Sequence, residues 1–182
     1  MKERPILFSG KMVRAILEGR KTQTRRVLKH TTEHKGPYSD TYIQHHIKSE
    51  GWAKICPYGK VGDQLWVRET FRVCDVAGEA FSPRDILPTN AHVHYRTGPQ
   101  PGGAGSWKPS IHMPRWASRI NLEVTDIRVE RVQDISIDDC VKEGVMSISF
   151  EGLWDSLNEK RGFGWGVNPW VWVLGFRRVD AE

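Results

Sequence analysis

The segment GRKTQTRRV, residues 19–27, places a lysine, two threonines and three arginines within nine positions. Lys21 and Thr24 are three residues apart, so their side chains would lie side by side in a helix or turn and on opposite faces of a strand. Assuming the turn, we expect burial and the neighbouring arginines to lower the pKa of Lys21 until it can act as a general base. Such a base would activate the Thr24 hydroxyl as a nucleophile. A solvated basic face is the alternative interpretation, and it involves no chemistry.

A carboxylate that could support this pair occurs further along the chain. Residues 65–73 alternate in polarity, which predicts a strand and places Glu69 on its apolar face between Val67 and Phe71. Desolvation of an ionised carboxylate is costly, so such a residue must be paired or must line a polar pocket. Glu69 is therefore a candidate to hold Lys21 in place or to exchange protons with it. An ion pair with some arginine is the alternative.

The composition predicts one globular domain spanning residues 1–182, with 38% hydrophobic residues and eight tryptophans. The net charge of +5 is concentrated near the N-terminus, where residues 1–35 contain ten Lys or Arg against three Asp or Glu. A local positive field of this kind attracts phosphates and other anions. Three cysteines without a CxxC spacing favour a reducing compartment. Neither a leader nor a membrane-length apolar run is visible, so we expect a cytoplasmic protein without membrane contact.

Most of the expected elements are strands. We expect strands at residues 5–8, 65–73, 91–95, 120–129 and 169–179, and helices at 10–18, from 136 to about 143, and around 150–157. The strand at 120–129 needs a bulge near Thr125 and Asp126 to keep both of its apolar sets inward. Residues 29–60 and 75–110 lack periodicity and are expected to be loop insertions. The predicted fold class is α+β and mainly β, a mixed and curved β-barrel with a few short flanking helices.

Several other side chains are candidates for ligand binding. A helix that starts after Ser9, at Gly10, would present free N–H groups to an anion. The motif IHMPRW supplies a titratable ring, a cation and an aromatic face, which suit a phosphate and a stacked base, through His112, Arg115 and Trp116. Structural packing is an equally good explanation for Trp116. Trp165 and Asn168 could edge a pocket, although a tryptophan near glycines more often covers the core.

The histidines do not predict a metal site. His92 and His94 would share one strand face, and His45 and His46 precede Cys56, but neither pair has a third ligand at a suitable spacing. We therefore expect no metal and no other cofactor.

Four segments together resemble the ASCH domain family, a branch of the PUA-like β-barrels, and most of all its phage and prophage members: ILFSGKMVRAILEGRKTQTRRV, YGKVGDQLWVRETF, KPSIHMPRWASRINLEVTDIRVERV and PWVWVLGFRR. The resemblance implies a curved barrel with a cleft suited to nucleosides or RNA. Some bacterial members of the family are amidohydrolases that remove the acyl group from N4-acetylcytidine, so the resemblance also implies this activity. Those members use a lysine and a threonine of a KxxT segment and a glutamate on the strand that follows. Carried over, these residues are Lys21, Thr24 and Glu69.

Taken together, these patterns lead us to expect a metal-independent hydrolase that acts on the exocyclic amide of an N4-acylated cytidine or a related modified nucleoside. Lys21 would deprotonate Thr24, Glu69 would support Lys21, and an acyl-enzyme would form. The expected substrate-binding residues are Ser9, Gly10, Arg26, Arg68, His112, Arg115 and Trp116. The alternative is an RNA-binding module or a metal-independent ribonuclease that uses the same basic cleft. The expected partner is thus a modified nucleoside or RNA, and the sequence does not predict an oligomeric state.

Overall fold

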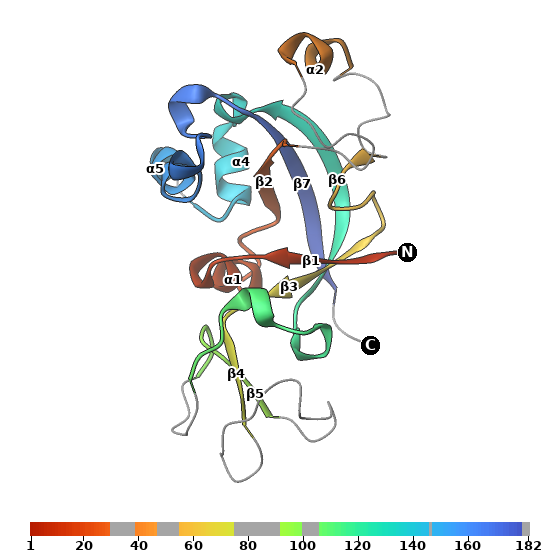
Figure 1. Cartoon of the computed structure of the whole chain (residues 1–182), viewed down its shortest axis with the longest axis vertical. Helices are drawn as coiled ribbons and strands as arrows, with labels where there is room; N and C mark the ends of the chain where they lie inside the picture. The colour runs from red at the N-terminus through yellow and green to blue at the C-terminus, as the bar shows by residue number, and fades with distance from the viewer. Residues whose placement is uncertain (30–38, 47–54, 75–91, 100–105, 146, 180–182) are drawn as a thin grey trace.

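A five-stranded mixed sheet forms the centre of the computed structural model, which describes residues 1–29, 39–46, 55–74, 92–99, 106–145 and 147–179. The strand order is β1-β3-β6-β7-β2, and β1 and β2 form its edges. The strands are β1 (Glu3–Leu7), β2 (Gln23–Val27), β3 (Gln64–Arg68), β6 (Asn121–Arg131) and β7 (Trp170–Val179). The sheet is strongly curved, and a two-stranded ribbon of β4 (Phe71–Cys74) and β5 (His92–Tyr95) projects from one end of it (Figure 1).

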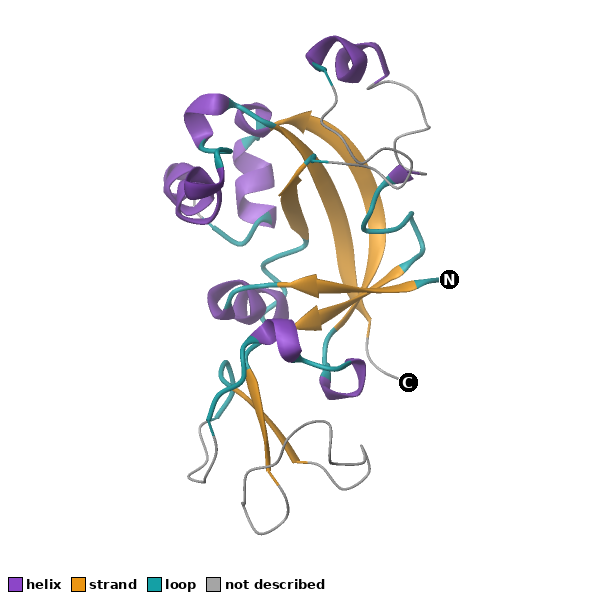
Figure 2. Cartoon of the chain, in the orientation of Figure 1, coloured by secondary structure: helices purple, strands orange, loops and turns teal. Residues whose placement is uncertain are grey.

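The helices are short and lie around the sheet (Figure 2). They are α1 (Gly10–Leu17), α2 (Asp40–His46), α4 (Ile137–Lys142) and α5 (Ser147–Asn158), with 3-10 turns η2 (Ser110–His112), η3 (Arg115–Ala117), η4 (Val132–Asp134), η5 (Glu159–Arg161) and η6 (Trp165–Val167). The predicted fold class is therefore confirmed: the fold is mixed and mainly β, with a curved sheet and a few short helices. Within the described ranges, no helix has both the length and the apolar character that a membrane crossing requires.

The long strands β6 and β7 behave as their apolar patterns predict. Their register shifts between Val124 and Asp126, which is the expected bulge. β7 is an interior strand, and its residues from Val171 to Leu174 are fully buried, in keeping with a sequence that is apolar on both faces. Ser136 caps α4 by accepting a hydrogen bond from the Asp139 amide at 3.1 Å, also as predicted.

The strand predicted at 65–73 is wrong as a single element. β3 ends at Arg68, and β4 starts at Phe71 and belongs to the separate ribbon. The two halves also pack into different apolar clusters, because Val67 joins the main core whereas Phe71 packs with Met113 and Ala117. Alternating polarity continues across the break, so the pattern alone gave no sign of the change of sheet.

The helical or turn conformation assumed for the KxxT segment is also wrong. Residues Gln23–Val27 form β2, which pairs antiparallel with β7, so that Thr24 lies opposite Leu174. The backbone of β7 provides hydrogen-bonding groups for this segment, and β-branched residues suit a strand. Strand alternation places Thr24 and Arg26 on one face and Arg25 on the other.

The turn after α4 packs closely against the chain just before β2. Lys21 forms an isolated antiparallel bridge with Glu143, and the Thr22 amide donates to the Lys142 carbonyl at 2.8 Å. Gly144 follows with φ +80°, and a Cβ there would lie 3.0 Å from the Cβ of Ala15 and 3.1 Å from that of Lys21. Only a glycine fits this contact without strain, and the contact brings the end of α4 onto Lys21.

We expect Gly144→Ala to destabilise the protein by about 1–3 kcal/mol, because it combines a strained backbone with overpacking. The matched control is Gly152→Ala in α5, where an added Cβ meets nothing within 4 Å and should stabilise the helix by about 0.5–1 kcal/mol. Urea unfolding of both variants measures this difference. Equal stability of the two variants would show that the contact at Gly144 is not tight.

Candidate active site

A cavity of about 640 Å³ opens between the edge strand β2, the junction of β1 with α1, and the helices α4 and α5. This volume is in the range of small-ligand sites. Its lining mixes apolar and cationic side chains: Leu7, Phe8, Ser9, Met12, Lys21, Thr24, Arg25, Arg26, Val27, Lys29, Pro57, Tyr58, Ser110, Glu143, Phe150, Leu153, Trp154, Leu157, Asn158 and Arg161. Lys21, Thr24, Arg26 and Ser9, all expected at the site, are thus brought into one cavity.

Lys21 and Glu143 form a buried ion pair at the base of the cavity. The Lys21 Nζ donates to Glu143 Oε2 at 2.6 Å, and the two side chains are only 2% and 6% exposed. It also donates to the carbonyls of Gln23 at 2.7 Å and Glu143 at 2.9 Å. Three acceptors match the three protons of an ammonium group, so Lys21 is charged in this arrangement.

Two opposing influences act on the pKa of Lys21. Burial lowers it below its ordinary value, and the charges of Arg26 and Arg25 lower it further, whereas Glu143 raises it. Lys21 therefore gives up its proton more readily than an exposed lysine does. The nearest acceptor for that proton is the Glu143 carboxylate, so the geometry allows the two groups to exchange a proton.

The other oxygen of Glu143 belongs to a second set of ion pairs. Arg25 Nη1 lies 3.3 Å from Glu143 Oε1, and Arg25 Nη2 lies 2.8 Å from Asp139 Oδ2. Arg25 also pairs with Glu130, which Arg128 contacts at 3.0 Å. Because its partners are carboxylates from β6 and α4, Arg25 is neutralised and fixes the position of Glu143.

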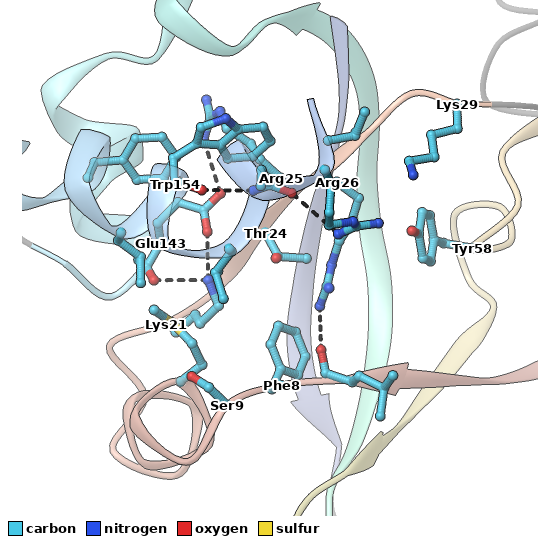
Figure 3. Close-up of a pocket in the computed structure, with 18 of the residues that line it drawn as sticks. Phe8, Ser9, Lys21, Thr24, Arg25, Arg26, Lys29, Tyr58, Glu143 and Trp154 are labelled. Atoms are coloured by element: carbon cyan, nitrogen blue, oxygen red, sulfur yellow. Dashed lines mark hydrogen bonds and ion pairs between the residues drawn. The ribbon is translucent and has the colours of Figure 1, made fainter. Parts of the chain in front are cut away.

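The Thr24 hydroxyl has no hydrogen-bond partner among the described residues. Thr24 nevertheless lines the cavity, and Figure 3 shows it between the Lys21–Glu143 pair on one side and Arg26 on the other. Phe8 lies beneath both cations, with its ring centroid 5.7 Å from Lys21 Nζ and 5.1 Å from Arg26 Cζ. A hydroxyl without a partner is free to meet a ligand, and catalytic hydrogen bonds often tighten only when substrate binds.

Glu69 does not line this cavity. It is 2% exposed, and it forms an ion pair with Arg119 at 2.9 Å and accepts a hydrogen bond from Thr97. Arg119 in turn lies over the Tyr95 ring at 4.0 Å. The expectation that Glu69 is buried and paired is met, but its partner is an arginine near the β4–β5 ribbon, and the carboxylate that meets Lys21 is Glu143.

The other predicted binding residues lie outside the cavity lining. Arg68 lies over the Trp66 ring at 4.6 Å, and Arg115 forms an ion pair with Glu3 at 2.8 Å. His112 is exposed in η2, and Trp116 packs on the cluster of Phe71 and Met113.

Gly10 begins α1 directly after Ser9. Ser9 does line the cavity, and its hydroxyl makes no capping bond. Trp165 packs edge-on against Phe150, and Asn168 ends η6, so neither belongs to the lining.

Sequence reasoning missed Glu143 and the contribution of α5. One signal for Glu143 was available: a carboxylate at the C-terminal end of a helix, before a glycine, opposes the helix dipole and requires a cationic partner. For α5, the spacing of Phe150, Leu153, Trp154 and Leu157 predicted a helix with an apolar face. That face covers the core and also forms a wall of the cavity. Asn158, the last residue of α5, and Arg161 in η5 extend this wall.

No group of three or more His, Cys, Asp or Glu side chains in the described ranges is arranged to hold a metal ion. His94 Nε2 lies 3.0 Å from Cys74 Sγ across the β4–β5 ribbon. The structure does not describe the side chains of His45 and His46. Most of each predicted loop insertion also lies outside the described residues, at 30–38, 47–54, 75–91 and 100–105.

The chain is similar in structure to an ASCH domain from Lactobacillus crispatus JV V101, with a TM-score of 0.47, 10% identity and coverage of 99% of this chain and 81% of that one. It is also similar to a protein of Enterococcus faecalis V583 described with the family DUF984, with a TM-score of 0.47, 9% identity and coverage of 100% and 82%. No protein-family model and no curated protein sequence matches the chain.

Proposed function

We propose that the cavity hydrolyses the exocyclic amide of an N4-acylated cytidine or a closely related modified nucleoside. The observation that carries the proposal is a buried Lys21–Glu143 pair in the same cavity as a threonine hydroxyl without a hydrogen-bond partner among the described residues. A proton-exchanging pair and a free hydroxyl are the parts that acyl transfer needs. The likeness of GRKTQTRR to the KxxT segment of the acetylcytidine amidohydrolases indicates which amide is cleaved.

The first half of the reaction forms an ester on Thr24. A proton moves from Lys21 to Glu143, and the resulting amine accepts the proton of the Thr24 hydroxyl. The Thr24 oxygen attacks the acyl carbonyl carbon, and the tetrahedral intermediate breaks its bond to N4, which takes up a proton from Lys21. Cytidine leaves, and the acyl group remains on Thr24. Glu143 has the role that the sequence suggested for Glu69.

The second half of the reaction uses one water molecule. The same Lys21–Glu143 pair accepts a proton from water, which attacks the ester carbonyl and releases the carboxylic acid. Thr24 recovers its proton, so the net change is hydrolysis of one amide bond. The oxyanion of each intermediate requires a donor, and Ser9, which lines the cavity, is the candidate. One such donor typically contributes about 3 kcal/mol to transition-state stabilisation.

The cavity walls also suit a nucleobase. Four aromatic rings from three separate segments line it: Phe8, Tyr58, Phe150 and Trp154. Planar aromatic and aliphatic walls with a few polar groups are typical of sites that bind a base by stacking.

The direct experiment incubates the purified protein with N4-acetylcytidine and follows cytidine and acetate by chromatography. We expect equal amounts of both products without added metal, and no products from Lys21→Met, which keeps most of the length of the side chain and removes its amine. The proposal is wrong if the protein turns over no acylated cytidine but binds RNA with an affinity that falls steeply with salt. That outcome favours a binding module.

A further inference from the structure

The cavity contains two kinds of cation. Five cationic side chains line it, and Glu143 is the sole carboxylate among its described lining residues. Lys21 and Arg25 are paired with carboxylates, as described above. The remaining three, Arg26, Lys29 and Arg161, form no ion pair with a described carboxylate. Among the described residues, these three positive charges are therefore not compensated by an ion pair.

The hydrogen-bond and ring partners of these three cations are neutral in the part of the chain that the structure describes. Arg26 donates to the Leu7 carbonyl and lies over the Phe8 ring. Lys29 Nζ lies 4.7 Å from the centroid of the Phe163 ring. Arg161 Nη1 is 3.5 Å from the side-chain oxygen of Asn158. The buried Nε of Arg26 has no hydrogen-bond partner at all within the described part of the chain. The Arg26 side chain is half-buried, and a buried donor atom without a partner is costly unless a ligand completes its bonding.

These cations lie close enough to influence one another. Burial lowers the pKa of Arg26, Tyr58 and Glu143 raise it, and the charge of Arg161 lowers it further. Both arginines also act on Tyr58, whose pKa burial raises, so that its hydroxyl remains a proton donor at neutral pH. Figure 3 shows Lys29 and Tyr58 on the Arg26 side of Thr24, opposite the Lys21–Glu143 pair. The Lys21–Glu143 pair and these donors therefore lie on opposite sides of Thr24.

We infer that Arg26, Lys29, Arg161 and the Tyr58 hydroxyl form a phosphate subsite, so that the ligand is a cytidine nucleotide and not a free nucleoside. Guanidinium groups and lysines bind phosphate through charge-assisted hydrogen bonds, and a phosphate would neutralise cations that otherwise repel each other. The position of the base depends on the proposed function, whereas the phosphate subsite depends only on these four side chains. The phosphate could belong to a free mononucleotide or to an RNA backbone, and the volume of the cavity favours the mononucleotide.

Binding measurements test the subsite independently of catalysis. Calorimetric titration with cytidine, cytidine 5′-monophosphate and a short cytidine-containing oligoribonucleotide compares ligands with no phosphate, one phosphate and a backbone. We expect the monophosphate to bind at least about 10-fold more tightly than cytidine, which is the usual effect of one charged hydrogen bond. Tighter binding of the oligoribonucleotide than of the monophosphate would identify RNA as the source of the phosphate.

A matched pair of variants locates the effect. Arg161→Gln should reduce the affinity for cytidine monophosphate about 10-fold and leave the affinity for cytidine unchanged. Lys160→Gln removes the same charge from the adjacent, exposed residue outside the cavity lining. It should change neither the affinity for cytidine monophosphate nor the affinity for cytidine. Equal affinities for cytidine and its monophosphate, or equal effects of the two variants, would overturn the inference. If the nucleotide discrimination is present but no acylated cytidine is hydrolysed, the subsite stands and the proposed reaction fails.

Discussion

Thr24→Ala is expected to reduce the rate of N4-acetylcytidine hydrolysis about 10³-fold or more while the protein remains folded. The loss follows from removal of the oxygen that forms the acyl-enzyme ester. The fold should tolerate the change, because the Thr24 hydroxyl makes no hydrogen bond with described residues and its backbone pairing with β7 is unaffected. Steady-state kinetics and urea unfolding of the same preparation separate the two effects.

Two further variants make this result specific. Thr24→Ser keeps a hydroxyl at the same position and should retain measurable activity. Thr22→Ala removes a hydroxyl two residues away on an exposed side chain and should leave the rate unchanged. If Thr24→Ala hydrolysed the amide at the normal rate, water and not Thr24 would be the nucleophile.

The second large effect is expected from Glu143→Gln, which should reduce both stability and activity. It removes the carboxylate that pairs with Lys21 and Arg25 and leaves two buried cations without that partner. Breaking a buried ion pair costs about 3–5 kcal/mol, and loss of an acid–base group reduces the rate about 10²-fold or more. Urea unfolding measures the first effect, and kinetics on the folded fraction measures the second.

Glu69→Gln is the matched control, because Glu69 is equally buried but pairs with Arg119 outside the cavity. It should lower stability by a smaller amount, since the Arg119 side chain is 29% exposed and can be rehydrated. The folded fraction should keep its full rate. A loss of rate in Glu69→Gln with a normal rate in Glu143→Gln would reverse the roles that we assign to the two glutamates.

Much of the fold follows from local patterns in the sequence. The strand β7 is apolar on both faces because it is an interior strand, and the phase change at Thr125 required the bulge between β6 and β7. The two errors, a continuous strand through Glu69 and a turn at Lys21, share one cause. Periodicity describes which side of an element is buried, but it does not specify which neighbouring strand the element pairs with.

For the same reason, only part of the candidate site could be predicted from the sequence. Lys21, Thr24 and Arg26 are adjacent in sequence, so their types and spacing could be recognised directly. Glu143 is more than a hundred residues from Lys21, and their contact depends on Gly144 and on the packing of α4 against the segment before β2. Arg161 likewise reaches the cavity because α5 lies along it. Long-range contacts of this kind are products of tertiary packing, which single-sequence patterns do not contain.

The most direct test of the central claim is to trap the acyl-enzyme. The protein is mixed with N4-acetylcytidine, quenched in acid within one turnover, digested and analysed by mass spectrometry. We predict a mass increase of one acetyl group on Thr24, absent from Thr24→Ala. Turnover of the substrate with the acetyl group on another residue, or with no acylated peptide at any quench time, would contradict a threonine nucleophile activated by the Lys21–Glu143 pair.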